Sequence, residues 1–335
     1  MFISIIIPTK NRPILVTKVL ADLAKQEFPR DHFEVLLIDD GSTKENLIKL
    51  RELLKPLELD FHFISKERGE GPAKARNLGI SRARGEWIAF TDDDVEIPPY
   101  WLKNACERIV QNPDILGIEG AITSDIIHPL YHYTQNMKGP YSKKYEGYLT
   151  ANMFFRKSTL VSIGGFDETF PRAFREDADL AFRVLAKGRI PFCEAIRVHH
   201  PARKLSLTEA IRRELRHESD PLIYKKHPDK YPCLFAQTNI LWFLLIVIQA
   251  GGGIFGFFFP WTFWGFNIFW VASLLATITF FIVGKGISTG IYRWFASYVR
   301  FYAFLRGCIK YKTRFPIISL TFKARKFKPI PTDQI

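Results

Sequence analysis

Cysteine is scarce in this chain of 335 residues, which has four, and none stands in a Cys-x-x-Cys spacing. Neither a zinc site nor a disulfide framework is therefore indicated. Acidic residues are few beyond residue 205: residues 206–335 carry 17 Lys and Arg against 6 Asp and Glu, whereas residues 1–205 carry 30 against 28. The excess basic charge thus lies in the C-terminal part, which favours anionic lipid headgroups over nucleic acid as a partner.

Charged side chains are missing altogether from residues 231–284, a run of 54 residues. At the rise of an α-helix, this length can cross a bilayer twice, so a wholly soluble protein is not the favoured interpretation. We expect a transmembrane hairpin within 233–284, with spans at about 235–257 and 262–283. Because Lys and Arg flank the pair on both sides, the positive-inside rule predicts a multi-pass protein of the plasma membrane with both termini in the cytoplasm.

Two basic segments border this uncharged run. Residues 206–232 are expected to form interfacial helices, since apolar residues recur at near-helical spacing among Arg and Lys. Residues 285–335 are predicted to be a basic, aromatic juxtamembrane tail in the cytoplasm, in which 287–309 favours an interfacial helix over a third span. The apolar run at the N-terminus ends at Pro8, is too short for a signal-peptide core, and is better explained as a buried strand.

Short apolar runs alternate with helical stretches over residues 1–205. The strands are expected at Ile3–Ile7, Val35–Ile38, Phe61–Ile64 and Trp87–Phe90. Helices are expected at Pro13–Glu27, Pro72–Arg82 and about Arg175–Lys187. Because the strands are apolar without alternation, both faces of the sheet should be covered, which predicts an α/β domain with a mostly parallel sheet between helices.

Polar clusters follow three of these strands, and ligands of open α/β sheets bind at that edge. Three adjacent carboxylates, Asp92-Asp93-Asp94, repel one another and would be stabilised by Mg²⁺ or Mn²⁺, although a solvated acidic turn is an equal alternative. Asp39-Asp40 could accept hydrogen bonds from a ribose or a base, or could form a plain turn.

Three further groups carry the same ambiguity. Arg76 lies near the start of a helix and could face a phosphate or solvent. Asp177 belongs to a cluster of acids in the first turn of another helix, where capping alone would favour them. His199-His200 follows an apolar run and could be structural or a metal ligand.

Taken in order, the motifs resemble those of the family-2 glycosyltransferases over about residues 2–205. The matching blocks are Ser4–Arg12, Val35–Thr43, Ala75–Gly79, Gly85–Asp94, Ala151–Arg156, Gly164–Glu168, Glu176–Leu180 and Val198–Pro201. The resemblance implies a GT-A fold, a nucleotide-sugar donor such as a UDP-, GDP- or dTDP-sugar, Mn²⁺ or Mg²⁺ as cofactor, and inversion at the anomeric carbon.

The resemblance also implies roles for single residues. Asp177 matches the catalytic base. Asp94 and Asp92 match the outer positions of the Asp-x-Asp motif and, with His200, are the expected metal ligands. The expected contacts to the donor nucleotide come from Thr9, Arg12, Asp39, Asp40, Arg76, Asp92 and Asp93.

The uncharged run suggests which acceptor such an enzyme would use. A membrane-held site favours a lipid-linked or membrane-proximal saccharide acceptor, as in surface-glycan assembly. A polyprenyl-phosphate monosaccharide transferase is the nearest alternative, but Val95-Glu96-Ile97 stands where that subfamily usually has Asp-Leu-Gln. A non-catalytic nucleotide- and lipid-binding membrane anchor is the alternative of another class. A nucleotidyltransferase is disfavoured because Pro8–Arg12 has no glycine for a phosphate loop.

Overall fold

The computed structural model describes residues 1–57, 59–126, 131–132, 148–230 and 287–313. These form two compact units. Unit 1 comprises the described residues of 1–126 and 148–202, and unit 2 comprises 131–132, 203–230 and 287–313. The predicted spans at 235–257 and 262–283 lie outside the described residues.

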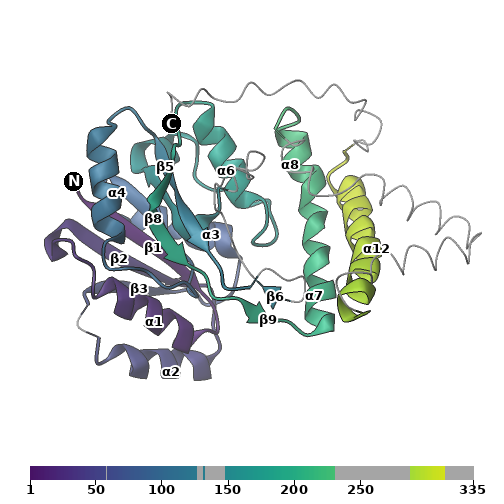
Figure 1. Ribbon diagram of the computed structural model, residues 1–335, viewed down its shortest axis with the longest axis horizontal. Helices are drawn as coiled ribbons and strands as arrows, with labels where there is room; N and C mark the ends of the chain where they lie inside the picture. The colour runs from purple at the N-terminus through teal and green to yellow at the C-terminus, as the bar shows by residue number, and fades with distance from the viewer. Residues whose placement is uncertain (58, 127–130, 133–147, 231–286, 314–335) are drawn as a thin grey trace, which may run out of the picture. The chain divides into compact units, whose positions relative to one another are not determined.

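Unit 1 is built on a seven-stranded sheet with the order β3-β2-β1-β4-β7-β5-β8. Its strands are β1 Ile3–Thr9, β2 Phe33–Asp39, β3 Phe61–Ser65, β4 Trp87–Phe90, β5 Gly117–Thr123, β7 Met153–Arg156 and β8 Phe192–His199. All run parallel except β7, which is antiparallel to both of its neighbours. The predicted α/β class with a mostly parallel sheet is confirmed (Figure 1).

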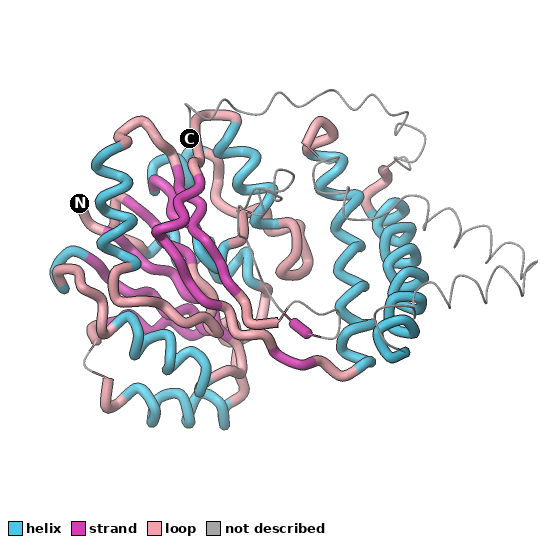
Figure 2. Tube along the Cα trace, viewed as in Figure 1, coloured by secondary structure: helices cyan, strands magenta, loops and turns pink. Residues whose placement is uncertain are grey.

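Helices cover both faces of this sheet (Figure 2). They are α1 Pro13–Leu23, α2 Lys44–Leu54, α3 Pro72–Arg82, α4 Trp101–Gln111, α5 Lys157–Ser162 and α6 Glu176–Leu185. Apolar residues of α1 and α4 pack in one cluster with Ile3, Ile5 and Ile7 of β1. Since side chains alternate along a strand, Ile6 faces the other way, and there it packs against Gly79 of α3, where a Cβ atom would clash.

The carboxyl ends of the parallel strands bring the candidate residues to one edge. Thr9 ends β1, Asp39 ends β2, and Asp92 follows β4. The chain after β4 then pairs with the end of β8, since Glu96 and His199 exchange backbone hydrogen bonds of 2.7 and 3.0 Å. This pairing carries the loop from β4 across the sheet edge, so that Asp94 meets the residue after β8.

Unit 2 is mainly helical. It contains α7 Leu207–Glu214, a 3-10 turn Leu215–Ser219, α8 Asp220–Lys226, α12 Ile287–Lys310, and the short strands β6 Tyr131–His132 and β9 Arg203–Lys204. A capping box begins α7, because Ser206 and Glu209 exchange side-chain to backbone hydrogen bonds. Within the described ranges, no helix combines the length and the apolar character needed to cross a membrane.

The segment from α7 to α8 runs parallel to α12 (Figure 1). Near the start of both, Ala210 packs with Tyr292 and Ala296. Near the end of both, the Lys225 ammonium donates 2.9 Å to the carbonyl of Tyr311. Leu205 is buried in the same cluster, and Ile211, which is partly buried, packs against it. Contact of residues 206–232 with a membrane surface stays a prediction.

Buried ion pairs join the α7 to α8 segment to α12. The carboxylate of Glu214 accepts hydrogen bonds from the Tyr292 hydroxyl and from Arg300 Nε, each at 2.7 Å. The carboxylate of Glu218 accepts one from Lys310 Nζ, also at 2.7 Å. Gly307 makes this approach possible, because a Cβ atom there would clash with the carbonyl oxygen of Glu218.

Candidate functional site

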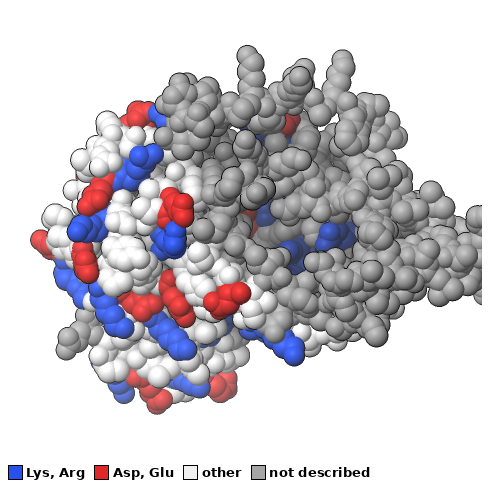
Figure 3. All heavy atoms as spheres, in the orientation of Figure 1, with Lys and Arg blue, Asp and Glu red and all other residues white. Residues whose placement is uncertain are grey.

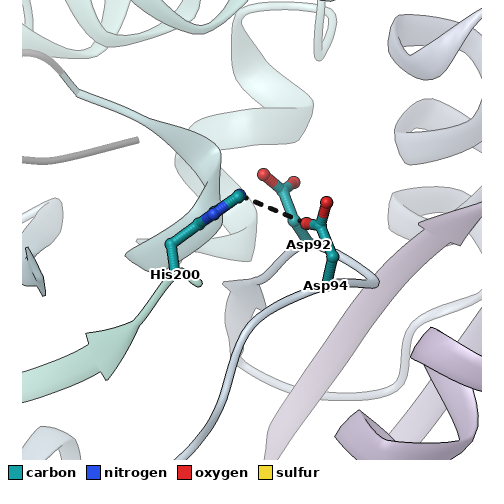
Figure 4. A group of neighbouring side chains, drawn as sticks. All are labelled: Asp92, Asp94 and His200. Atoms are coloured by element: carbon teal, nitrogen blue, oxygen red, sulfur yellow. Dashed lines mark ion pairs between the residues drawn. The ribbon is translucent and has the colours of Figure 1, made fainter. Parts of the chain in front are cut away.

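Three predicted metal ligands meet at the sheet edge of unit 1. Asp92, Asp94 and His200 each offer one ligand atom, and these atoms all lie within 4.8 Å of one another (Figure 4). Nε2 of His200 lies 3.2 Å from a carboxylate oxygen of Asp94. Two carboxylate oxygens and one imidazole nitrogen form a donor set that suits Mn²⁺ and is open to Mg²⁺. The residues present therefore fit a single divalent cation.

The two adjacent histidines point to different partners. His200 faces the carboxylates of the cluster, whereas Nε2 of His199 lies 2.8 Å from Asp125 and its Nδ1 lies 2.9 Å from the Thr123 hydroxyl. Alternation along an extended strand accounts for this, because neighbouring side chains leave opposite faces. The geometry thus selects His200, and not His199, as the histidine of the cluster.

His200 is 1% exposed. Burial lowers the pKa of its imidazole, but the hydrogen bond with Asp94 and the negative charges of Asp94 and Asp92 outweigh burial and raise the pKa. The protonated ring is thus stabilised by the same carboxylates that would share a cation with the neutral ring. A divalent cation and the proton compete for one position.

Thr9 and Arg12 hold the acidic loop. The Thr9 hydroxyl donates a hydrogen bond of 2.7 Å to Asp93. One guanidinium nitrogen of Arg12 donates hydrogen bonds of 2.9 Å to both Asp93 and Asp94. Asp93 is buried; desolvation raises the pKa of its carboxyl group to about 6, against the opposing effect of Arg12. These residues lie together at the sheet edge, with the Asp93 carboxylate facing Thr9 and Arg12. Their contact with a donor nucleotide stays a prediction.

Arg76 links the cluster to the helix that carries the predicted base. Its guanidinium donates hydrogen bonds of 3.2 Å to Asp92 and 3.0 Å to Glu176. The guanidinium carbon lies 5.5 Å from the centroid of the Phe166 ring. Burial is nearly complete for both Arg76 and Glu176. Desolvation and the adjacent charge of Asp177 raise the pKa of Glu176, although Arg76 opposes them.

Asp177 lies in the first turn of α6, beside this bridge. Desolvation raises the pKa of its carboxyl group, while the amide of Ala178, at 2.8 Å, and the charges of Arg76 and Arg175 oppose that shift. Arg175, the residue before α6, has a left-handed backbone with φ of 79°. A non-glycine residue in this conformation is strained, and such strain is concentrated at functional sites. A carboxylate with a raised pKa is suited to accept a proton near neutral pH.

The acids at the start of α6 have specific partners. Glu176 pairs with Arg76, and Asp179 pairs with Arg183 at 2.7 Å. The residue before the helix makes no side-chain capping hydrogen bond. The sequence pattern alone left capping open as the reason for these acids, but two of them form ion pairs instead.

Asp39 and Asp40 accept hydrogen bonds from nearby loops. Asp39 accepts from the hydroxyls of Ser42 and Ser65, the second at 3.0 Å. Asp40 accepts from Lys66 at 2.7 Å and from the backbone amides of Glu70 and Gly71 at 3.0 and 2.8 Å. These contacts hold the loops that follow β2 and β3. Contact of either carboxylate with a base or a ribose stays a prediction.

Two residues that the sequence did not single out also shape the site. Glu176 anchors Arg76, and Asn77 holds the loop before α6 by hydrogen bonds with the backbone of Phe166 at 2.8 and 2.9 Å. Both stand inside blocks that were recognised as motifs, next to Asp177 and Arg76. Their adjacency to candidate residues was the available signal.

The arrangement provides a cation site, a cationic bridge and an adjacent carboxylate. Around it, the face of unit 1 drawn in Figure 3 shows basic and acidic side chains interspersed, without a broad region of one sign. This face shows no strip of positive charge of the kind that tracks a nucleic-acid backbone.

Known proteins resemble this chain in sequence. Residues 4–168 match the family described as Glycosyl transferase family 2. Poly(ribitol-phosphate) beta-N-acetylglucosaminyltransferase TarS of Staphylococcus aureus is 37% identical over 117 residues, covering 35% of this chain and 20% of TarS. GalNAc(5)-diNAcBac-PP-undecaprenol beta-1,3-glucosyltransferase of Campylobacter jejuni is 30% identical over 95 residues, covering 28% of this chain and 30% of that enzyme. The chain thus spans less than a third of either relative.

Solved structures share the fold over most of the chain. Mannosyltransferase PcManGT from Pyrobaculum calidifontis, in complex with GDP-Man and Mn²⁺, has a TM-score of 0.59 and 17% identity, covering 92% of this chain and 86% of PcManGT. TarS 1-349 in complex with UDP-GlcNAc has a TM-score of 0.52 and 17% identity, covering 93% of each chain. The mostly parallel sheet fits the GT-A fold of such enzymes.

Proposed function

We propose that this enzyme moves a sugar from a nucleotide-sugar donor to a lipid-linked or membrane-proximal saccharide acceptor in surface-glycan assembly, since residues 4–168 match glycosyl transferase family 2. The transfer inverts the anomeric carbon and depends on Mn²⁺ or Mg²⁺. The observation that carries the proposal is the Asp92, Asp94 and His200 cluster, which lies beside the bridge from Arg76 to the helix of Asp177.

Asp177 acts on the acceptor. Its carboxylate accepts the proton of the acceptor hydroxyl as the oxygen attacks the anomeric carbon, and the bond from that carbon to the nucleotide diphosphate breaks on the opposite face. One in-line displacement inverts the configuration, so no second protein carboxylate is needed as a nucleophile. The raised pKa of Asp177 makes it a stronger base than an ordinary aspartate.

The other residues bind and orient the donor. Asp92, Asp94 and His200 would hold the divalent cation, which supplies positive charge to the departing diphosphate when bound. Arg76 keeps Asp92 in place and adds a cation at the inner side of the cluster. Thr9, Arg12, Asp39 and Asp40 lie at the ends of β1 and β2, where the base and ribose of the donor would bind.

Membrane attachment supports the choice of acceptor. The uncharged residues 231–284 and the basic segments that border them suit a multi-pass plasma-membrane protein with its catalytic domain in the cytoplasm. The relative from Campylobacter jejuni is named for a polyprenyl-diphosphate-linked acceptor, and TarS for a phosphate-containing polymer. Attachment would raise the effective concentration of a membrane-borne acceptor around the site.

The test is nucleotide release from a panel of UDP-, GDP- and dTDP-sugars. Detergent-solubilised full-length protein is incubated with each sugar, with Mn²⁺ or Mg²⁺, and with or without a membrane lipid extract. We expect metal-dependent release from one donor, accelerated by the extract. Product stereochemistry, read from the anomeric proton by NMR, should be opposite to that of the donor.

Asp94→Asn is the first variant to compare. It removes the carboxylate that joins His200 and Arg12, so metal-dependent release should fall by about 10²–10³-fold or more. Asp114→Asn is the matched control, since Asp114 is an exposed aspartate of the same unit that pairs with Arg189. Normal Mn²⁺-dependent turnover by Asp94→Asn would contradict the metal assignment. Tight nucleotide binding without turnover on any donor and acceptor would instead support the anchor alternative.

A further inference from the structure

Helix α12 has a packed face and an outward face. The packed face, turned to α7 and the 3-10 turn, contains Tyr292, Ala296, Ala303 and Gly307, together with Arg300, which binds Glu214. At 3.6 residues per turn, these positions lie within about a third of the helix circumference. Among the described side chains, exposed apolar residues of α12 lie on the opposite side of the helix.

Large apolar side chains line that side. Exposed fractions are 58% for Tyr302, 37% for Leu305 and 81% for Ile309. These residues follow one another at spacings of three and four positions, so they form one continuous stripe along the helix. We call these three residues the α12 stripe.

The α12 stripe differs from the exposed apolar residues of unit 1. Ile48, Val110 and Val161 are 60%, 68% and 61% exposed, but they lie on three different helices. Single exposed apolar residues are normal on any protein, whereas a contiguous stripe marks a contact with a partner or a membrane. The stripe therefore needs an occupant.

The surroundings of the stripe favour lipid. The uncharged run of 54 residues ends at Gly284, and α12 begins at Ile287, so the helix follows directly on the most apolar part of the chain. Arg306 and Lys310 border the stripe, with side chains 57% and 46% exposed. Aromatic and aliphatic residues beside a basic margin are typical of a helix that lies in the interface of an anionic bilayer.

We propose that the α12 stripe lies in the headgroup and acyl boundary of the membrane, with the axis of α12 parallel to the bilayer plane. The inference rests on the membrane attachment in the proposed function and specifies which face of unit 2 meets the lipid. Tyr302, Leu305 and Ile309 enter the boundary, and Arg306 and Lys310, which pair with Glu218, lie beside them as the basic margin of the stripe. A second copy of the chain seated on the stripe is the competing occupant.

The test uses site-specific fluorophores on the full-length chain. The four native cysteines are changed to serine, and single cysteines are placed by Tyr302→Cys, Leu305→Cys or Ile309→Cys, with Ile48→Cys and Val110→Cys as controls of similar exposure in unit 1. Each labelled protein is reconstituted into vesicles of phosphatidylcholine and phosphatidylglycerol. Quenching is then compared between a doxyl-labelled phosphatidylcholine in the bilayer and iodide in the water.

We expect labels at the three α12 positions to lose most of their emission to the doxyl lipid and to be protected from iodide, with the reverse result at positions 48 and 110. Equal access of iodide to all five labels would overturn the proposal. Protection from both quenchers, together with cross-linking between copies, would assign the stripe to a second chain and also overturn it.

These outcomes are independent of catalysis. The labelled positions are exposed, and donor turnover by each labelled protein, and by the unlabelled protein without cysteine, is measured beside the fluorescence. Lipid contact without turnover on any donor and acceptor would refute the transferase and leave the α12 placement standing. Turnover without lipid contact at the three positions would refute only the placement.

Discussion

The chain buries carboxylates in two regions, with opposite electrostatic results. At the sheet edge of unit 1, burial raises the pKa of Asp93, Glu176 and Asp177. In unit 2, burial also disfavours the charge of Glu214, but hydrogen bonds from His217 and Tyr292 and the charge of Arg300 outweigh it and hold the pKa well below its usual range.

The difference lies in the ratio of cations to carboxylates. In unit 2, Arg300 and His217 face Glu214, and Lys310 and Arg306 face Glu218. In unit 1, three arginines (Arg12, Arg76 and Arg175) and His200 face five carboxylates, namely Asp92, Asp93, Asp94, Glu176 and Asp177. Unit 2 uses buried charge to fix a helix arrangement. The sheet edge keeps an excess of negative charge that a divalent cation and a proton would neutralise.

The largest expected effect comes from removing the base at the sheet edge. In Asp177→Asn, transfer should fall by about 10²–10⁴-fold while donor binding persists, because the acceptor proton loses its recipient. Discontinuous assays measure the rate of transfer, and calorimetry measures the binding of the donor nucleotide. Asp179→Asn is the control in the same helix; it removes the partner of Arg183 and should lower stability instead. Transfer near the wild-type rate in Asp177→Asn would show that Asp177 has no role as a base.

Removing the buried acid of unit 2 should act on stability and not on chemistry. Glu214→Gln leaves Arg300 without its buried counter-charge, and we expect a loss of about 3–5 kcal/mol in the stability of unit 2. Hydrogen exchange in α12 and chemical unfolding measure this. Glu209→Gln, an exposed change in the same helix, should have a much smaller effect, because glutamine can replace glutamate in the capping box. Equal effects of the two variants would contradict the structural role of Glu214.

A smaller effect is expected where a carboxylate acts through its neighbours. In Glu176→Gln, Arg76 loses its anchor and Asp92 is held less firmly, so the Mn²⁺ concentration for half-maximal donor hydrolysis should rise by about 10–100-fold. Saturating Mn²⁺ should restore most of the rate. A rate loss that Mn²⁺ does not restore would place Glu176 in the chemistry itself.

The smallest effect is a shift in pH dependence. The base must be deprotonated, and the pKa of Asp177 is raised above the usual value of about 4. The rate of transfer should therefore be lost as pH falls through this raised pKa and should reach a plateau above it. A profile of kcat/KM against pH measures the pH at which the rate falls on the acidic side. A fall centred on the ordinary aspartate pKa would contradict the desolvated environment of Asp177.

Much of the sheet followed from local sequence patterns. The bounds of β4 and α3 agree with the sequence prediction, since each is a buried run or a proline-started helix with little ambiguity. Helix α1 was predicted to reach Glu27 but ends at Leu23. The side chain of Gln26 accounts for this, because its contacts lie far along the chain. It donates a hydrogen bond to the carbonyl of Pro98 and accepts one from the amide of Leu102.

The site was predictable in its members and less so in its contacts. The meeting of Asp92, Asp94 and His200 was implied by the family motifs, and the geometry brings them together. The pairing of Arg76 with Glu176 joins residues 100 positions apart, which no local spacing encodes. Likewise, the hydrogen bonds that Asp40 accepts depend on where the fold places Lys66 and the backbone amides of residues 70 and 71.

The parallel course of α7, α8 and α12 places the end of α8 beside the end of α12, one helix length or roughly 35 Å from the start of α12. A hairpin of two crossings begins and ends on the same side of a bilayer. If α12 lies in the bilayer plane, as proposed, the end of α8 and the start of α12 lie at the same depth, which suits the proposed hairpin.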